Sequence, residues 1–332
     1  MNRANRNAKL IRIGKTLIIN IFRFSLIIAL AFMILYPLLR MINIAITYPR
    51  ALNMVGSVWV PTAISSDNIR TAWAILNFVP YFTYTIRVVG AMMLLQMANA
   101  AFAGYAFARL RFRGMGILFV FVLITFIIPM EVFRLPRHIM FVNFDIFGIV
   151  TAVRGSPLNL IGEPTVMYIM TGLGMGIAGG LFVYIFRQFF RGLPKELEEA
   201  AYVDGAGFIR TFFTIVLPMA KPAFLTVGTL SFIWNYNDTT LSSLFDTMGQ
   251  YLLARINTLA QTVGGTTMIQ QQIGIATRTG RLSHDVVTVD NVIYDAAIFS
   301  TTTLLSILPL ILLFLIIQKQ FVQGVERSGI VG

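Results

Sequence analysis

The sequence contains no cysteine and only two histidines among its 332 residues. The absence of cysteine excludes disulfides, zinc–thiolate clusters and thiol catalysis. The two histidines, His138 and His284, form no H-E-x-x-H or similar metal-binding pattern with the residues around them. No metal site is therefore expected, and no nucleophile paired with a base is visible that would make this chain an enzyme within a membrane.

The sequence also lacks a complete phosphate-binding loop of the form G-x-x-x-x-G-K-[ST]. Gly14, Lys15 and Thr16 match its last three positions, but Lys9 stands where the first glycine is required. That loop holds phosphates through closely approaching backbone amides, which a side chain at this position would obstruct. If the protein depends on ATP, its hydrolysis is expected on another chain, and no cofactor is expected on this one.

Charged residues are scarce, at 12% of the chain against roughly 25% in soluble domains, while 57% of the residues are hydrophobic. This composition is typical of a membrane protein. A formal net charge of +12 would favour nucleic-acid binding in a soluble protein, because clustered Lys and Arg neutralise phosphates. Here the basic residues flank hydrophobic runs, so we interpret them as a signal of membrane orientation and expect no nucleic-acid partner.

A membrane-spanning helix needs about 20 mostly apolar residues, and each charge at its centre costs about 2.5–3.5 kcal/mol. Six hydrophobic runs fit this description, of which the fifth, with 16 residues, is the weakest. They are 24–39, extended back to residue 16, and 88–108, 114–130, 165–186, 222–237 and 296–318. The sequence therefore predicts an all-α polytopic membrane protein with six transmembrane helices.

Basic residues indicate how these helices are oriented. With a cytoplasmic N-terminus, 16 of the 26 basic residues fall on the inner side, together with 5 of the 14 acidic ones. Because Lys and Arg are enriched in cytoplasmic loops, both termini are predicted to be cytoplasmic. The first run has the look of a signal peptide, with Ala29, Leu30 and Ala31 as a triplet of cleavage type. An uncleaved anchor is favoured, because the apolar run continues to Leu39.

This orientation divides the chain into four parts: a basic cytoplasmic N-terminus (1–15), a first helix with its external loop (16–81), a transmembrane core (82–319) and a cytoplasmic tail (320–332). The core contains a cytoplasmic loop, 187–221, and a long polar external loop, 238–295. Loops of this length are uncommon unless they have a function.

The cytoplasmic loop 187–221 has the punctuation of two short helices. Pro194 suits a first helical position, and Glu196 lies where the positive end of the helix dipole favours a carboxylate. Gly205 can end this helix in a left-handed conformation, and Leu217 and Pro218 close the second segment. By the spacing of three and four, one face of the first helix collects residues suited to close contact with another protein: Leu197, Ala200, Ala201 and Asp204.

Three blocks of this loop stand at fixed spacing: Glu199-Ala200-Ala201, then Gly205 after three residues, then Ile215-Val216-Leu217-Pro218 after nine. They resemble in full the EAA signature of permeases of binding-protein-dependent ABC importers. The resemblance implies the type I ABC importer (MetI-like) permease fold, in which the loop forms coupling helices that seat in a cleft of the ATP-binding subunit. The residues expected at that contact are Glu196, Glu199, Ala200, Ala201, Asp204, Gly205, Ile215, Leu217 and Pro218.

Two further segments are similar to the carbohydrate-importing, maltose-type (MalG-like) branch. Residues 106–112, Ala-Phe-Ala-Arg-Leu-Arg-Phe, resemble its usual turn after the second span, and 320–325 resemble its terminal F-V-x-G segment. The usual continuation departs at Glu326 and Arg327. The similarity runs from about Tyr84 to the end of the chain, and it implies a sugar or oligosaccharide as the solute, while amino acids, phosphonates and polyamines stay open.

The resemblance also implies partners for this chain. They are two ATP-binding subunits that hold ATP and Mg, a second related permease subunit, an extracytoplasmic solute-binding protein facing the loop 238–295, and the lipid of the bacterial inner membrane. An ion-gradient-driven secondary carrier is the alternative. Such carriers usually show internal repeats and ionisable residues within their spans, and the predicted spans of this chain show neither, so this alternative is disfavoured. Glu131 is the acid nearest the membrane core, and it is interpreted as an interfacial partner of Arg134.

Two patterns within the spans are ambiguous. Gly172, Gly176 and Gly180 recur every four residues along the run 165–186, which favours close helix packing over a pore-lining role. At the end of the run 222–237, aromatic and amide side chains suit contact with a sugar, although an aromatic belt at the membrane interface has the same composition. The candidates for this solute pathway are Trp234, Asn235, Tyr236 and Asn237.

Overall fold

The computed structural model describes residues 3–54, 59–246, 251–263 and 266–329, with side chains described for 13–54, 59–246, 251–261 and 267–319. The described chain is helical except for one short antiparallel hairpin, β1 (Thr262–Val263) and β2 (Thr266–Thr267). It divides into two compact units, of which the first comprises Met1–Ile75 and Thr262–Leu305, and the second Leu76–Gln261 and Ser306–Gly332.

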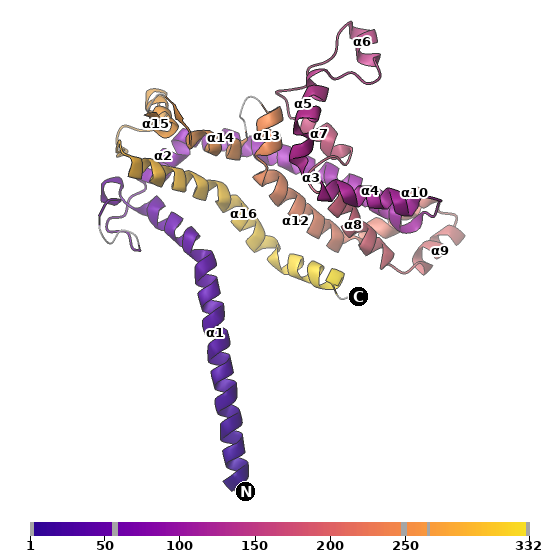
Figure 1. Cartoon of the computed structure of the whole chain (residues 1–332), viewed down its shortest axis with the longest axis horizontal. Coiled ribbons are helices and arrows are strands. Elements are labelled where there is room, and N and C mark those ends of the chain that lie inside the picture. The colour runs from indigo at the N-terminus through magenta and orange to yellow at the C-terminus, as the bar shows by residue number, and fades with distance from the viewer. Residues whose placement is uncertain (1–2, 55–58, 247–250, 264–265, 330–332) are drawn as a thin grey trace. The chain divides into compact units, whose positions relative to one another are not determined.

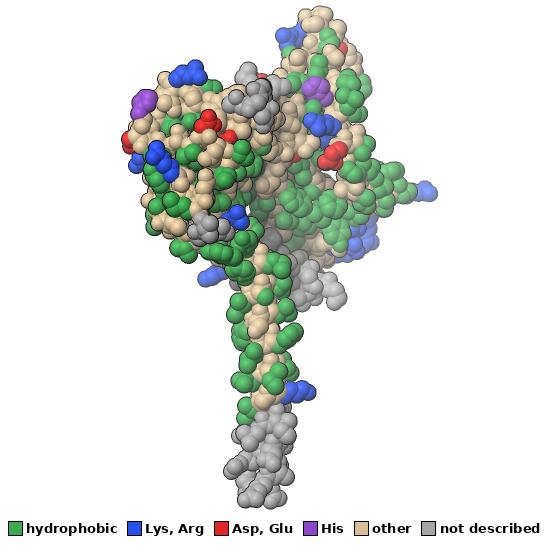
Figure 2. All heavy atoms as spheres, turned by 60° about the vertical axis from the view of Figure 1, so that its left-hand side comes forward, with side chains coloured by type: hydrophobic (Ala, Val, Ile, Leu, Met, Phe, Trp, Pro, Cys, Tyr) green, Lys and Arg blue, Asp and Glu red, His purple; other side chains and the backbone are tan. Residues whose placement is uncertain are grey.

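The first unit is dominated by one long N-terminal helix (Figure 1). Between residues 13 and 40 its side chains are almost all exposed and mostly apolar, and Figure 2 shows hydrophobic groups along the visible face of this helix. Asn68 fixes the end of the helix, because its Nδ2 donates to the carbonyls of Ile44 and Thr47 at 2.8 Å. The elements of this unit are α1 (Arg3–Ile46), η1 (Pro49–Ala51), α2 (Asp67–Leu76), the hairpin, α15 (Met268–Arg278) and the first part of α16 (Val292–Gly329).

The second unit holds the remaining helices. They are α3 (Phe78–Arg109), α4 (Met115–Ile127), η2 (Met130–Phe133), α5 (Arg134–Val142), α6 (Ile149–Arg154), α7 (Thr165–Gly172), α8 (Gly179–Arg191), α9 (Glu196–Val203), α10 (Phe208–Thr211), the π-helix η3 (Phe212–Val216), α11 (Leu217–Met219), α12 (Lys221–Asn237), α13 (Thr240–Phe245), α14 (Leu252–Leu259) and the end of α16. In Figure 1, α8 and α12 run beside α3, and these three helices carry most of the packing of the unit.

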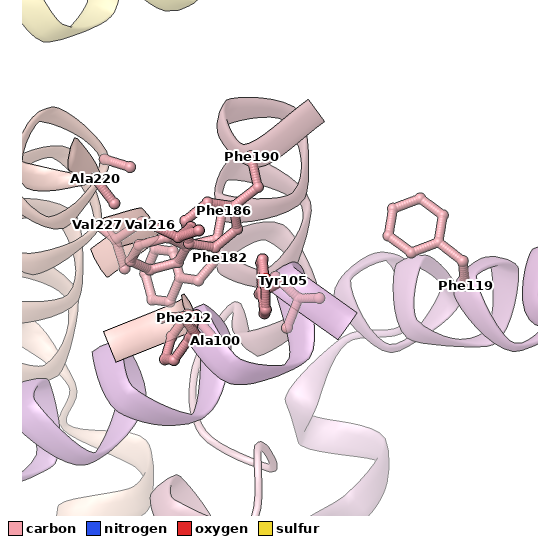
Figure 3. Close-up of a cluster of buried hydrophobic side chains, with 13 residues drawn as sticks. Ala100, Tyr105, Phe119, Phe182, Phe186, Phe190, Phe212, Val216, Ala220 and Val227 are labelled. Carbon is pink, nitrogen blue, oxygen red and sulfur yellow. The ribbon is translucent and has the colours of Figure 1, made fainter. Parts of the chain in front are cut away.

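An aromatic cluster forms the core of this packing (Figure 3). Phe182, Phe186 and Phe190 extend from successive turns of α8 toward Tyr105 of α3 and Phe212 of η3. Tyr105 lies 4.8 Å from Phe212 between ring centroids, a distance at which aromatic pairs add stability beyond their buried area. The cluster therefore joins α3 and α8 to the start of the helical segment that leads into α12.

Three helices are long and apolar enough to cross a membrane: Ile13–Ile46 within α1, Phe78–Arg109, and Val292–Lys319 within α16. Two pairs of shorter helices qualify only if each is counted as one bent span: Met115–Ile127 with Met130–Val142, bent by 94°, and Phe208–Met219 with Lys221–Asn237, bent by 77°. The described residues therefore provide three to five candidate spans. Five of the six predicted runs fall on these helices, while the count of six stays a prediction.

The predicted run 165–186 is the exception, because it is not one helix. It is divided between α7 and α8 by the irregular segment 173–178, in which Gly174 has φ +79° and Ala178 has φ +53°. Gly172, Gly176 and Gly180 therefore do not repeat along one helix. The predicted close packing is nevertheless found at Gly180, where a Cβ would clash with the backbone carbonyl of Val122 on α4. Glycine adopts a positive φ at little cost in free energy, because it has no Cβ. The same residues that permit close helix packing therefore also permit a helix to end.

The orientation in the membrane stays a prediction, since no membrane accompanies the structure. Residues 1–2 and 330–332, within the predicted cytoplasmic termini, lie outside the described residues, as do 247–250 and 264–265 of the predicted external loop. The pairing predicted for Glu131 is not found, because the ion pairs of the described residues are Arg70–Asp285 and Arg109–Glu198.

Gly104 is the position where the packing of α3 on α8 leaves no room for a side chain. A Cβ there would lie 2.6 Å from Cβ of Phe186 and 2.9 Å from the backbone nitrogen of Arg187. We expect Gly104→Ala to lower the thermal unfolding midpoint of the purified protein in detergent, in line with overpacking penalties of about 1–3 kcal/mol. Gly90→Ala on the same helix, with no atom within 4 Å, is the control and should leave the midpoint unchanged or higher. Equal midpoints in the two variants would contradict the close approach.

Candidate functional site

The first predicted helix of the cytoplasmic loop is present as α9 and ends as predicted. Gly205 has φ +81°, and its N–H donates to the carbonyl of Tyr202 at 3.1 Å. The N–H of Ala206 donates to the carbonyl of Ala201 at 2.9 Å. These two bonds form a Schellman motif, which satisfies the last carbonyls of the helix. The first turn of α9 carries three glutamates, where the positive end of the helix dipole stabilises carboxylates.

The second predicted segment runs from Phe208 to Met219 through α10, η3 and α11. Its middle, η3, is a π-helix, a form that is rare and concentrates at functional sites. Of the signature residues here, Ile215 and Leu217 are half-buried, and Pro218 is exposed in the first turn of α11. The bend of 77° follows directly, before α12 begins at Lys221. We call residues 192–220, between α8 and α12, the coupling segment.

The exposed face of α9 contains most of the residues expected to contact a partner. Glu196, Glu199, Ala200, Asp204 and Gly205 are exposed. Two apolar side chains that the sequence reasoning did not select are also exposed: Val203 of α9, with 88% of its surface exposed, and Ile209 of α10, with 70%. Exposed apolar groups rimmed by charged residues are typical of protein interaction sites.

Ala201 differs from this set, because it is buried, with an exposed fraction of 6% in this chain alone. A partner can only add to that burial, so Ala201 packs within the permease and does not offer its side chain to another subunit. The face grouped by spacing in the sequence is therefore reduced in the structure to Leu197, Ala200 and Asp204.

A buried ion pair, which the sequence reasoning missed, attaches α9 to α3. Nε of Arg109 lies 2.6 Å from Oε1 of Glu198, and the two side chains are only 8% and 7% exposed. The hydroxyl of Tyr105 donates to the other carboxylate oxygen at 3.1 Å, and Arg109 also donates to the carbonyl of Leu193 at 3.0 Å. Charges removed from water in this way are stable only when paired and hydrogen-bonded, and here both conditions are met.

The four candidates for a solute pathway at the end of α12 have different environments. Trp234 stacks on Phe182 with 5.5 Å between ring centroids, and Tyr236 is buried with its hydroxyl donating to the carbonyl of Ser306 at 2.8 Å. Asn235 is also buried, whereas Asn237 is exposed. In this conformation the four side chains thus do not line one surface.

Asp238 follows α12 directly and lies two residues before the start of α13. Its carboxylate accepts from the backbone N–H groups of Thr240 and Leu241. Burial raises the pKa of this carboxyl, against the opposing effect of these two donors.

A groove with a volume of about 970 Å³ lies beside the coupling segment. Its walls are almost wholly apolar and come from α3, α11, α12 and the end of α16. The signature residues Leu217 and Pro218 belong to this wall, as do Met97 and Phe224. The end of the signature therefore faces an open apolar surface of this chain, while its beginning faces away from the chain on α9.

Comparison with known proteins identifies the class to which this site belongs. The family model described as "Binding-protein-dependent transport system inner membrane component" matches residues 100–327, which is more than half of the chain. The chain belongs to this family. It is a multi-pass inner-membrane permease of a transport system that depends on a binding protein, and not itself an enzyme.

Individual relatives align along most of the chain. The maltodextrin transport system permease protein MdxG of Bacillus subtilis (strain 168) is 24% identical over 310 residues, covering 90% of this chain and 95% of that protein. The arabinooligosaccharides transport system permease protein AraQ of Halalkalibacterium halodurans is 25% identical over 306 residues, covering 91% and 93%.

A solved structure confirms the fold. The crystal structure of a bacterial ABC transporter involved in the import of the acidic polysaccharide alginate matches with a TM-score of 0.61, covering 97% of this chain and 99% of that chain. The two sequences are 18% identical, and at this level the structural similarity is evidence of a shared fold only. The expected type I importer permease fold is thereby confirmed.

The ion pair gives a test of how α9 is held. In Glu198→Gln, Arg109 keeps its charge in a buried place without a counter-ion, which typically lowers stability by about 3–5 kcal/mol. We expect a lower thermal midpoint and faster maleimide labelling of a cysteine introduced by Ala201→Cys, since the chain has no other cysteine. Glu196→Gln, on the exposed side of the same helix, should change neither quantity. Unchanged labelling in Glu198→Gln would show that the pair does not hold α9 in place.

Proposed function

We propose that this chain is the permease subunit of an ATP-driven importer for a sugar or an oligosaccharide. The observation that carries the proposal is the coupling segment, which contains the complete EAA signature and in which the first block of that signature lies on α9, a capped helix with an exposed face. The family supports transport that depends on a binding protein, and the names of aligned relatives, such as maltodextrin and arabinooligosaccharides, support the class of solute.

The role of the coupling segment is to receive the movement of an ATP-binding subunit. The exposed face of α9, with Glu199 and Ala200, is the contact surface, where the carboxylate offers polar contacts and the alanine permits close approach. The buried pair of Arg109 and Glu198 ties this surface to α3, so that a displacement of α9 reaches a membrane-spanning helix. Gly205 provides the turn that α9 needs to meet the second segment.

The complete importer contains two ATP-binding subunits, a second related permease subunit and an extracytoplasmic solute-binding protein. ATP and Mg are held by the ATP-binding subunits, because this chain has no complete phosphate-binding loop. The binding protein docks on the external loops, including residues 238–295. Closure of the ATP-binding subunits around ATP opens the pathway outward, and hydrolysis resets it.

The single experiment that tests the function is purification of the tagged chain from its host in mild detergent, followed by reconstitution of what accompanies it. We expect a P-loop ATPase and a second permease in the complex, and uptake of labelled oligosaccharides into proteoliposomes only with internal ATP and added binding protein. Uptake driven by a proton or sodium gradient without ATP would favour the secondary carrier instead. Uptake of an amino acid or polyamine, but of no sugar, would correct the class of solute.

Ala200 gives the most direct test of the contact surface. It is exposed in the middle of α9, so Ala200→Trp should leave the thermal stability of this chain unchanged while obstructing a closely packed partner. We expect loss of most of the ATPase subunit from the purified complex, measured by mass photometry or by quantified gel bands. Val153→Trp, on the exposed side of α6, introduces the same bulk elsewhere and should retain the full complex. Retention of the ATPase subunit in Ala200→Trp would exclude α9 as the contact.

A further inference from the structure

The break between α7 and α8 lies beside the central turns of α3, which the candidate span Phe78–Arg109 places within the membrane. Both helices pack on α3, and the residues of α3 that touch the break, Gln96 and Asn99, stand about midway along the spanning helix Phe78–Arg109. Irregular backbone at this depth is tolerated only where its polar groups are satisfied by protein or water. The segment 173–178 must therefore find partners for the carbonyls that helix geometry no longer satisfies.

Two amide side chains of α3 provide these partners. Nδ2 of Asn99 donates to the carbonyl of Gly172, the last residue of α7, at 2.9 Å, and Nε2 of Gln96 donates to the carbonyl of Ile177, two residues before α8. Glycines make this approach possible, because a Cβ on Gly176 would lie 3.1 Å from Nε2 of Gln96 and one on Gly174 would lie 3.0 Å from Oδ1 of Asn99.

Gln96 also binds α12. Its Oε1 accepts from the hydroxyl of Ser231 at 2.6 Å and from Nδ2 of Asn235 at 3.1 Å. The three side chains are 0–2% exposed, so this is a polar cluster enclosed within the helix packing. Oδ1 of Asn235 has no hydrogen-bond partner among the described residues, although it is buried. An unsatisfied buried acceptor costs about 1–3 kcal/mol, so this conformation does not satisfy the cluster fully.

The position of this cluster relates it to the coupling segment. α8 leads directly into the coupling segment, and α12 leads directly out of it. The cluster holds each of these two helices at the end that is farther from the coupling segment. It contacts the break just before α8 begins, and it includes residues in the last two turns of α12. A displacement of the coupling segment moves α8 and α12, and its effect on the rest of the unit depends on how their far ends are fixed.

We propose that residues 173–178 are a hinge that lets α8 move relative to α7 during transport, and that Gln96 is the positioning residue that sets this hinge against α12. The proposal rests on the proposed function, since the movement originates at the ATP-binding subunits. Gln96 is buried in this conformation, with 2% of its surface exposed. It acts through the backbone of the break and through Ser231 and Asn235.

The first experiment measures coupling in the reconstituted importer. Gln96→Met keeps the length of the side chain and removes its three hydrogen bonds. We expect the ratio of ATP hydrolysed to solute imported to rise by about fivefold or more, the lower end of usual coupling effects, with hydrolysis itself maintained. Ser231→Ala removes one of the bonds and should raise the ratio less. Thr226→Val is the matched control on α12, because the hydroxyl of Thr226 donates only to the carbonyl of Pro222 in its own helix.

A merely structural role would give a different result. If Gln96 only stabilised the fold, uptake and hydrolysis would fall together and the ratio would stay at the wild-type value, which would overturn the proposal. If Gln96→Met yields no folded complex, the ratio in Ser231→Ala decides in its place. Wild-type complex without any ATP-dependent uptake would remove the proposed function, and with it the coupling role of Gln96.

The second experiment observes the hinge directly and needs no solute. Because the chain has no cysteine, the pair Thr165→Cys on α7 and Gln188→Cys on α8 can be spin-labelled without background, and both positions are exposed. We expect the distance between the labels to change between the nucleotide-free and ATP-bound complexes, and to be broader in both states after Gln96→Met. One unchanged distance in both states would mean that α7 and α8 move as a rigid body, which would overturn the hinge.

Discussion

The contact between Arg109 and Glu198 determines how this permease presents its coupling segment. Both charges are almost fully removed from water, so neither could remain in place without the other. Their pairing fixes the rotation of α9 about its own axis, because Glu198 and Ala201 face inward and Glu199 and Ala200 then face outward. The exposed surface that suits a partner is thus a consequence of a buried one, and the same pair connects it to the end of a membrane-spanning helix.

A related constraint operates inside the packed helices, where backbone groups cannot rely on water. At the break between α7 and α8, the amides of Gln96 and Asn99 replace the missing helical partners. Further along the chain, the turn at Gly205 satisfies its carbonyls through the backbone alone. The break therefore depends on hydrogen bonds from side chains of a neighbouring helix. The turn at Gly205 depends only on hydrogen bonds within its own backbone, so it can keep its conformation when the coupling segment moves.

The sequence predicts those features that depend on local composition or on contiguous motifs. The long helices α1, α3 and α16 follow from hydrophobic length, and α9 with its cap at Gly205 follows from punctuation and from the EAA signature. The break at 173–178 was missed because hydropathy measures composition, and glycines that suit helix packing equally suit a helix end. The ion pair was missed because Arg109 and Glu198 are 89 residues apart, and nothing local distinguishes Glu198 from the exposed glutamates beside it. Ala201 was predicted to contact a partner because residue spacing groups side chains on one face of a helix. Spacing does not tell whether that face points outward or into the same chain.

The angle of 77° between the segment Phe208–Met219 and α12 has a consequence for the direction of force. Two rigid arms joined nearly at a right angle act as a crank, so a push along the short arm displaces the long arm sideways and hardly along its own axis. In the proposed mechanism α12 then moves sideways in the plane of the bilayer, so its apolar length stays matched to the hydrocarbon thickness. The ends of the helix, with their unsatisfied backbone groups, are not drawn into the lipid. In the proposed mechanism, a movement received at the coupling segment thus changes the lateral separation of the helices with little hydrophobic mismatch.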